Sequence, residues 1–448
     1  MTPKNIRVED VDGILKEART EELLEWAKYM IPYYGVRPIV IKEGSGSTLR
    51  DISGKEYIDF ASIAHSNILG YGCQEVKEKM REQIDELSTI TGTHGYSIPA
   101  LQLGKLIAEI APGELSRYYS SAGGSESVDI AIKTVRAVTG RQKIIARWGG
   151  YHGCLAWSGS ASGTVLYKRA YDPISPGFIH VPPPYCYRCT FGLEYPSCGL
   201  ACAKVIEDAI KYEGPTIAGV IGEMIIGGGG VVVPPDDYWP TVKKTCDEYD
   251  VPLIDDEIIT SFGRTGKMFA CEHWGISPDV MTVSKGLASC YNPISAVLVT
   301  EKIAKGVEKL QAYHFNTYSY HPVSCAAALA TIRVIVERNL VDRSARLGEK
   351  LRKKLSAIVD EFDVLDGLGG KGLYFGFEIV KSKQTRVPDP DLAGRIANSA
   401  FKNGLLINVS RMRMKEGVIG TICPPLVVTE EEMDKGLEIL RSTIQQLI

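Results

Sequence analysis

Two features are missing from this 448-residue sequence: a long apolar run and an excess of charge of one sign. No stretch reaches the roughly 18 apolar residues that a membrane-spanning helix needs, so no such helix is expected. Residues 1–30 are charged throughout and contain no apolar signal-peptide core, which predicts a cytoplasmic protein. Lys and Arg total 51 against 54 Asp and Glu, and the net charge of −3 favours neither nucleic acid nor a membrane as partner.

A dinucleotide-binding fingerprint and a disulfide framework are missing as well. The glycine run at 227–230 follows an apolar segment, but VVVPP follows it where a Rossmann motif requires a helix. The eleven cysteines are odd in number, and most lie singly in apolar surroundings, as expected of small buried side chains. These absences argue against a nucleotide-binding oxidoreductase and against a disulfide-stapled fold.

The pattern that is present is an alternation of short apolar runs with helical segments. Between residues 115 and 300 the runs are RYYSSA, KIIARW, FIHV, AGVIGEMII, VPLIDDE, VMTVSK and ISAVLVT. This order is typical of an α/β fold with a mostly parallel central sheet flanked by helices.

The two ends of the chain have a different pattern. A helix is expected over residues 14–30, and three short apolar runs between 38 and 60 predict an antiparallel strand meander. The tail of the chain predicts a smaller α+β domain. We therefore expect a large domain over 65–328 and a small domain built from 1–64 and 329–448.

A lysine stands at the end of one of the apolar runs. In VMTVSKGLA a buried-looking strand ends at Ser284 and Lys285 follows, in the region where open α/β sheets bind ligands. Desolvation there can remove the proton of a lysine and make it a nucleophile. Taken alone, a solvated lysine at a strand end is the better interpretation.

Acidic residues end another of these runs. In VPLIDDE the strand delivers Asp255, Asp256 and Glu257 together, and such charge next to an apolar strand needs a partner. A metal or a protonated heterocycle would serve, and a helix N-cap or a turn is an equally good interpretation of the motif in isolation.

A small-residue turn precedes the helix expected at 125–138. AGGSES follows the strand RYYSSA, and backbone N–H groups at such a helix start can bind phosphate, although a plain capped helix is also consistent. A combination of motifs decides between the functional and the plain structural interpretations. It consists of this turn, the aromatic YHG motif, the acidic strand end and the strand-end lysine. Pyridoxal phosphate needs an anion site, a ring-stacking group, an acid for its ring nitrogen and a lysine for the imine.

With these motifs the sequence resembles the class III (ω-amino acid type) aminotransferases of fold type I. The resemblance extends from GKEYIDF near the N-terminus to PPLVVTEEEMD near the C-terminus. It implies an α/β fold with a large and a small domain, pyridoxal 5′-phosphate as cofactor, an amino donor and an oxo-acid acceptor as substrates, and a homodimer with shared active sites.

The resemblance also implies roles for residues around the cofactor. Gly124 and Ser125 in AGGSES should hold the phosphate. In YHG, Tyr151 should stack on the pyridine ring, with His152 beside it. Glu223 occupies the position of the family's Glu-Pro motif near the ring.

The remaining roles concern the chemistry itself. Asp256 should pair with the ring nitrogen and keep it protonated, and Ile258 should pack on the opposite ring face. Lys285 should carry the cofactor as a Schiff base and move the proton at the substrate Cα. In NTYSYHPV, Thr317 should reach the phosphate bound by the neighbouring subunit.

Departures from the family pattern bear on the substrate. Thr421 stands where many members carry a carboxylate-binding arginine, and Gly228 stands where glutamate-using members carry a glutamate. Asn408 is the nearest match to the arginine that binds the acceptor in amine–pyruvate enzymes, with Arg411 or Arg413 as substitutes. We expect an ω-amine, β-amino acid or aminosulfonate donor and a 2-oxo acid acceptor such as pyruvate. Racemisation, epimerisation and decarboxylation stay open as alternatives.

One motif has no place in this pattern. CYRCTFGLEYPSCGLAC arranges four cysteines as C-x2-C-x8-C-x3-C, at residues 186, 189, 198 and 202. Four thiolates at short spacing can bind zinc tetrahedrally. A loop of reduced, packed thiols is the favoured alternative, because the spacing fits zinc sites loosely. A metal here would be structural, and no metal is assigned to the active site.

Overall fold

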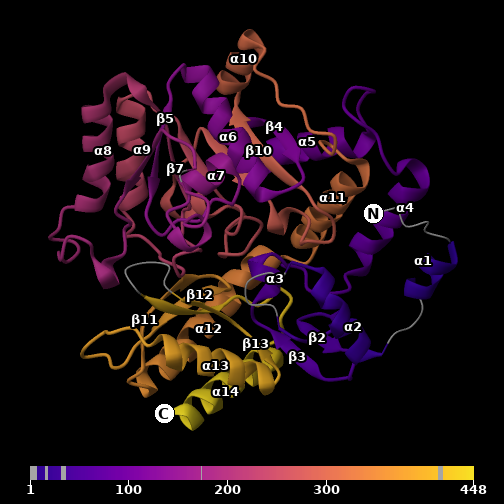
Figure 1. Cartoon of the computed structure of the whole chain (residues 1–448). Helices are drawn as coiled ribbons and strands as arrows, with labels where there is room; N and C mark the ends of the chain where they lie inside the picture. Colours follow the sequence, from indigo (N-terminus) through magenta and orange to yellow (C-terminus); the bar gives the residue numbers. More distant parts are fainter. Residues whose placement is uncertain (1–7, 16–18, 32–36, 173, 412–416) are drawn as a thin grey trace, which may run out of the picture.

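The computed structural model describes residues 8–15, 19–31, 37–172, 174–411 and 417–448. Figure 1 shows a larger upper part built around one sheet and a smaller lower part that contains the C-terminus. Within the described ranges, no helix is both long and apolar enough to cross a membrane.

Seven strands form the central sheet in the order β4-β10-β9-β8-β7-β5-β6. β6, β5, β7, β8 and β9 run parallel, whereas β10 is antiparallel to both of its neighbours. The predicted mostly parallel sheet is therefore confirmed. The strands are Leu115–Ser121 (β4), Lys143–Arg147 (β5), Phe178–Val181 (β6), Ile217–Gly222 (β7), Leu253–Asp256 (β8), Val280–Val283 (β9) and Ser295–Thr300 (β10).

Both faces of this sheet are buried, which explains why its strands are nearly continuous apolar runs. Leu253 and Ile254 are neighbours on β8, but they belong to two separate hydrophobic clusters. Helices α6, α7 and α10 contribute to one cluster, and α5, α8, α9 and α11 to the other. These helices are Ile98–Ile110 (α5), Gly124–Thr139 (α6), Ala156–Ala161 (α7), Ala201–Glu213 (α8), Tyr238–Glu248 (α9), Glu301–Leu310 (α10) and Pro322–Glu337 (α11).

The lower part contains two four-stranded sheets. The predicted antiparallel meander forms β1, β2 and β3, and β13 joins it in parallel, so both ends of the chain share one sheet. The second sheet is antiparallel, in the order β11-β12-β15-β14. The strands are Ile41–Ser45 (β1), Thr48–Asp51 (β2), Glu56–Asp59 (β3), Leu365–Lys371 (β11), Tyr374–Ile379 (β12), Leu405–Leu406 (β13), Asn408–Arg411 (β14) and Val418–Ile422 (β15).

The C-terminal helices of the lower part are α12 (Leu340–Glu361), α13 (Pro390–Lys402) and α14 (Glu430–Leu447). Near the N-terminus, the single helix expected over 14–30 is wrong. α1 (Val8–Leu15) and α2 (Thr20–Trp26) are separate, because Arg19 between them is extended, with ψ 157°. The division into domains at 64/65 and 328/329 stays a prediction, and its second boundary falls inside α11.

Candidate active site

A cavity of about 190 Å³ opens at the carboxyl ends of β7, β8 and β9, beside the start of α6. This is the edge of a parallel sheet at which α/β folds bind their ligands. The structure brings eight of the nine predicted site residues to its walls: Gly124, Ser125, Tyr151, His152, Glu223, Asp256, Ile258 and Lys285. It also adds five that the sequence did not single out, Gly153, Ile225, Ile259, Thr260 and Ser284.

The start of α6 forms one wall of the cavity. Gly124 is the first residue of this 16-residue helix, so its free N–H groups and the helix dipole favour an anion there. A β-carbon at Gly124 would lie 3.0 Å from the Cδ1 atom of Ile258, which explains the glycine. The Ser125 hydroxyl accepts a hydrogen bond from the Cys154 N–H at 3.3 Å. The wall therefore has the features of a phosphate site.

Asp256 and His152 form a buried pair. The His152 Nδ1 atom lies 2.7 Å from Oδ2 of Asp256, and both side chains are buried. Asp256 also accepts hydrogen bonds from the Ile258 N–H at 3.2 Å and the Thr282 hydroxyl at 3.3 Å. Two donors and the His152 ring thus surround this carboxyl and fix its orientation at the cavity wall.

Lys285 comes two residues after β9 and lines the same cavity. Burial lowers the pKa of its amine, while the negative charges of Asp256 and Glu223 partly oppose that shift. Its backbone φ of 33° is unusual for a side chain with a β-carbon, and such strain clusters at functional sites. A lowered pKa increases the neutral fraction, which is the nucleophilic form of a lysine.

Glu223 holds the backbone of the cavity wall. Its Oε1 atom accepts from the Tyr151 N–H at 3.0 Å and its Oε2 atom from the Gly227 N–H at 2.7 Å. Burial, with a contribution from Asp256, raises the pKa of this carboxyl, and His152 opposes the shift. A β-carbon at Gly228 would lie 2.5 Å from that of Tyr151, so a larger residue there would displace the Tyr151 side chain.

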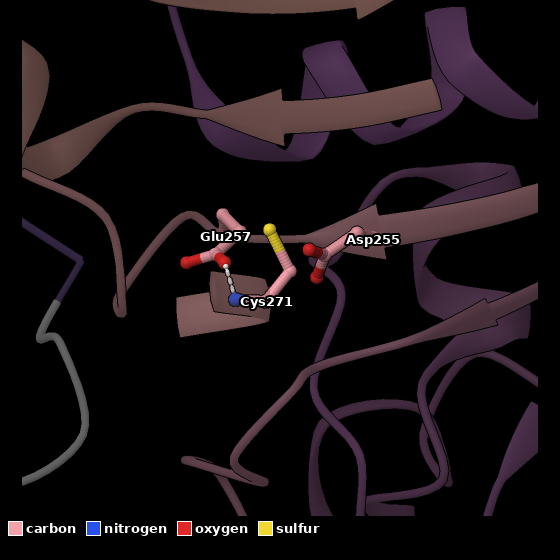
Figure 2. Close-up of side chains that lie close together, drawn as sticks. All are labelled: Asp255, Glu257 and Cys271. Carbon is pink, nitrogen blue, oxygen red and sulfur yellow. Dashed lines mark hydrogen bonds between the residues drawn. The ribbon is translucent and has the colours of Figure 1, made fainter. Parts of the chain in front are cut away.

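A second acidic pair lies on the other side of β8, and the sequence had left its role open. Figure 2 shows the Cys271 sulfur between the carboxyl groups of Asp255 and Glu257, with ligand atoms of all three within 4.8 Å of one another. Glu257 accepts from the Cys271 N–H at 2.8 Å and from the Thr260 hydroxyl. Neither Asp255 oxygen has a hydrogen-bond partner among the residues described.

The protonation of this pair differs from that of Asp256. Burial and the neighbouring Glu257 raise the pKa of Asp255 well above its ordinary range. Burial also raises the pKa of Glu257, to about 7. Because Glu257 has donors on both oxygens and Asp255 has none, we place the proton on Asp255. Asp256 is therefore the member of the acidic motif whose charge faces the cavity.

Thr317 is the predicted site residue that does not line the cavity. It is exposed, in a turn after α10. The turn is held by Asn316, whose side chain donates to Glu126 and accepts from the Tyr318 N–H at 2.7 Å. The predicted role of Thr317 concerns a neighbouring subunit's cofactor, which a single chain does not test, so this role stays a prediction.

Two positions that the sequence linked to the substrate, Thr421 and Asn408, lie on neighbouring strands of the second small sheet. Thr421 is buried on β15 and faces Asn408 across the β14–β15 ladder. The Asn408 side chain lies 3.1 Å from Nε2 of His65. Arg413 and the side chain of Arg411 lie outside the described residues. In the part of the chain that the structure describes, no arginine lines the cavity.

The residues present fit the cofactor that the resemblance implies. The α6 start suits its phosphate, and the ionised Asp256 suits a protonated ring nitrogen. Lys285 suits its aldehyde, because a desolvated amine is nucleophilic. A β-carbon at position 124 would press on Ile258. The glycine there therefore leaves open the space between the anion site at the start of α6 and the Ile258 side chain.

Comparison with known proteins places the chain in a family. The sequence matches the profile of "Aminotransferase class-III" over residues 30–444. It is 34% identical over 433 residues to a leucine/methionine racemase of Thermococcus litoralis, covering 95% of this chain and 96% of that protein. It is 32% identical over 437 residues to a taurine–pyruvate aminotransferase of Bilophila wadsworthia, covering 93% and 95%.

Solved structures agree with the fold. An (S)-enantioselective omega-transaminase from Thermomicrobium roseum superposes with a TM-score of 0.91 at 31% identity, covering 97% of this chain and 100% of that one. A match of this extent in sequence and structure shows that the chain belongs to the class III aminotransferases, which are pyridoxal 5′-phosphate-dependent enzymes of fold type I.

Proposed function

We propose that this enzyme moves the amino group of an ω-amine, β-amino acid or aminosulfonate donor to a 2-oxo acid such as pyruvate. The observation that carries this proposal is the absence of arginine from the described walls of the cavity, with Thr421 at the family's carboxylate-binding position. An α-carboxylate is usually bound by a bidentate arginine, and an amino donor that has no α-carboxylate does not need that arginine. A relative named as a taurine–pyruvate aminotransferase is consistent with this donor class.

A steric observation argues against glutamate as donor. Members of the family that use glutamate often carry a second glutamate at the position of Gly228. In this chain the Tyr151 side chain already fills the space that a β-carbon at Gly228 would need. The cavity wall is therefore built around Tyr151, and a glutamate there would require Tyr151 to move.

In the proposed mechanism the chain's residues hold the cofactor and move one proton. The N–H groups at the start of α6 and the Ser125 hydroxyl bind the phosphate. Tyr151 and Ile258 hold the ring from its two faces. Bound pyridoxal phosphate supplies an electron sink that acidifies the substrate Cα–H bond. The Lys285 amine, whose pKa is lowered by burial, would act as the base that accepts the substrate Cα proton and as the acid that gives it back.

Asp256 makes that proton transfer possible by its charge. The ionised carboxylate stabilises a protonated ring nitrogen, and the hydrogen bond with His152 fixes its orientation. Glu223 positions Tyr151 through its backbone N–H. We further propose a homodimer in which the partner's Thr317 completes the phosphate site.

Racemisation is the second candidate, favoured by the similarity to the leucine/methionine racemase. Racemisation and transamination both begin by breaking the Cα–H bond with the same lysine. They differ in where the proton returns, because a racemase gives it back to Cα. The reaction therefore has to be distinguished by its products.

The test is product analysis on the purified holoenzyme. We expect alanine to form from pyruvate when taurine, β-alanine or a simple primary amine is supplied, and not with the Lys285→Ala variant. Without an oxo acid, the molar amount of donor consumed should not exceed the molar amount of enzyme. Interconversion of leucine enantiomers far beyond the amount of enzyme, with no oxo acid present, would replace the proposal by racemisation. Alanine formed only from α-amino acid donors would contradict the proposed donor class.

A further inference from the structure

The turn that carries Thr317 belongs to an exposed aromatic segment. Thr317 itself is exposed, and the side chains of Tyr313, Phe315 and Tyr318 around it are 63%, 67% and 64% exposed. Several large aromatic side chains gathered on one exposed segment are typical of a surface that another protein chain covers. This segment therefore supports the homodimer proposed above, in which Thr317 reaches the partner's cofactor phosphate.

The aromatic segment is anchored to α5 at its C-terminal end. Tyr118 of β4 connects the two regions, because its hydroxyl donates to the Ala100 carbonyl of α5 at 2.8 Å and its carbonyl accepts from the Tyr320 hydroxyl at 3.1 Å. Further exposed large side chains lie at the start of α5: Tyr96, Ile98 and Leu101. A turn anchored at one end can present Thr317 to a second copy of the chain only if the rest of the turn is held as well.

Asn316 holds the turn on both sides of Thr317. Its side-chain amide donates to Oε1 of Glu126, and its side-chain oxygen accepts from the Tyr318 N–H at 2.7 Å. Glu126 belongs to the first turn of α6, the helix whose start forms the phosphate site. Its other oxygen, Oε2, accepts from the Ala122 N–H at 3.1 Å. One carboxyl group therefore joins the Thr317 turn to the beginning of the phosphate-binding helix of the same chain.

A second contact joins the same two elements. The Lys133 amine on α6 lies 2.8 Å from Nδ1 of His314, and Nε2 of that ring lies 3.6 Å from Oε1 of Glu126. Burial, and then the charge of Lys133, lower the pKa of His314, although Glu126 opposes the shift. A neutral ring can accept from the Lys133 ammonium at Nδ1 and direct its Nε2–H toward Glu126. The segment before Thr317 is thus held by α6 at two places.

We propose that Asn316 and Glu126 are positioning residues whose effect appears in the active site of the partner subunit. They fix the turn against α6, so that Thr317 keeps the place from which it binds the phosphate across the subunit interface. In a symmetric dimer, each α6 would hold one phosphate at its own start and, through Glu126, place a ligand of the other phosphate. This positioning role rests on the proposed homodimer with shared sites, and it names the side chains that make the sharing possible.

Mixed dimers separate an effect on the partner's site from an effect on the chain's own site. In the first dimer, one chain carries Asn316→Ala and the other carries Lys285→Ala, so the one site with a lysine faces an unchanged Thr317 turn. In the second dimer, one chain is unchanged and the other carries both substitutions, so the one site with a lysine faces the altered turn. The two dimers contain the same substitutions, and only their distribution differs.

Cofactor binding to these full-length dimers is the measurement. Borohydride fixes the cofactor only to a chain that retains Lys285, so labelling at increasing pyridoxal phosphate concentrations gives the dissociation constant of that one site. We expect this constant to be about tenfold higher in the second dimer than in the first, because a hydrogen bond to a charged group is lost from the turn that faces the site. Equal constants in the two dimers, or a higher constant in the first, would overturn the proposal.

A matched control uses Lys309→Ala, which removes an exposed side chain of α10, in place of Asn316→Ala. The two control dimers should have the same dissociation constant for the cofactor. A difference between them as large as that expected for Asn316 would mean that any change on this surface disturbs the partner's site, and the assignment to Asn316 would be wrong.

An exchange of donor and acceptor tests the contact itself and covers an Asn316→Ala chain that fails to fold. Asn316→Asp keeps an acceptor for the Tyr318 N–H but places a like charge beside Glu126, and should raise the dissociation constant in the second arrangement only. Adding Glu126→Gln to the same chain restores the bond with donor and acceptor exchanged, and should return the constant to within about threefold of wild type. An unchanged constant with Asn316→Asp, or no rescue by Glu126→Gln, would contradict the role of this contact.

The mass of the holoenzyme in solution separates failure of the homodimer from failure of the positioning role. A monomer would remove the shared sites and, with them, the role of Asn316. A dimer in which Thr317→Ala weakens cofactor binding in the second arrangement, while Asn316→Ala does not, would leave the homodimer in place and overturn only the positioning role.

Discussion

The two sides of β8 use the same functional group in opposite ways. On the cavity side, Asp256 has His152, Thr282 and a backbone N–H as partners. On the other side, no donor among the described residues reaches the Asp255 oxygens, and burial together with the neighbouring Glu257 raises the pKa of Asp255 and keeps it neutral. The difference teaches that adjacent carboxyl groups in one strand acquire different charges from their surroundings alone.

The largest effect should come from removing the base on the cavity side. Lys285→Ala should lower kcat by about 10⁴-fold, because nucleophilic attachment and proton transfer are lost together. The cofactor should still bind non-covalently through the α6 start. Steady-state kinetics and cofactor content measure both quantities, with the exposed Lys244→Ala as control. Wild-type-like turnover would refute the assignment of Lys285.

The same substitution on the two sides of β8 tests the comparison directly. Asp256→Asn should lower kcat/KM by about 10²–10³-fold, since it removes the charge opposite the ring nitrogen. Asp255→Asn should change kcat/KM by less than about threefold, because asparagine resembles the protonated acid that we infer there. A larger decrease in kcat/KM for Asp255→Asn than for Asp256→Asn would contradict the comparison.

Glu257 should affect stability and its pH dependence rather than the rate. Its folded-state pKa of about 7 is above the ordinary value of 4.5, so the folded state binds more protons between these pH values. Stability from this group is therefore present below about pH 4.5 and is lost as the pH rises through about 7. Urea unfolding of the wild type should show this decrease. Glu257→Gln should make this decrease smaller without removing it, because Asp255 also binds its proton more tightly in the folded state. The substitution should cost about 1–3 kcal/mol for mismatched hydrogen bonds.

The smallest effect concerns a single hydroxyl on the cavity side. Thr282→Val removes one donor to Asp256 and should raise the activation free energy by about 0.5–1.5 kcal/mol. In the Asp256→Asn background the same change should have a smaller effect, because the two residues act together. Equal effects in both backgrounds, measured as kcat/KM, would mean that Thr282 acts independently of Asp256.

Much of the fold could be predicted from local patterns. β5, β8, β9 and β10 lie where apolar runs bounded by polar or turn residues predicted them, because strands buried on both faces read as continuous apolar segments. β11 was not predicted, since LDGLGGK is glycine-rich and resembles a loop. The residues of LLINVS (405–410) are continuous in the sequence, but they pair in two different sheets.

The candidate site was predictable to the extent that its motifs are local. The motifs AGGSES, YHG, IDDE and VSK contain six of the eight predicted residues that the structure brings together, and the resemblance to the family added Glu223 and Ile258. Contacts between distant residues were not predictable. Glu223 binds the backbone of Tyr151 across 72 residues, and nothing in either motif indicates the other.

The sequence by itself determined that a parallel sheet would present a lysine, an acidic strand end and a helix start at one edge, because the periodicity of each segment and the alternation of strands with helices are local properties. It also determined that Asp256 would point away from Asp255 and Glu257, since side chains alternate along a strand. Only the tertiary structure decided which of the two sides faces the cavity. That choice depends on His152, Thr282 and Cys271, whose positions are set by packing between segments far apart in the chain.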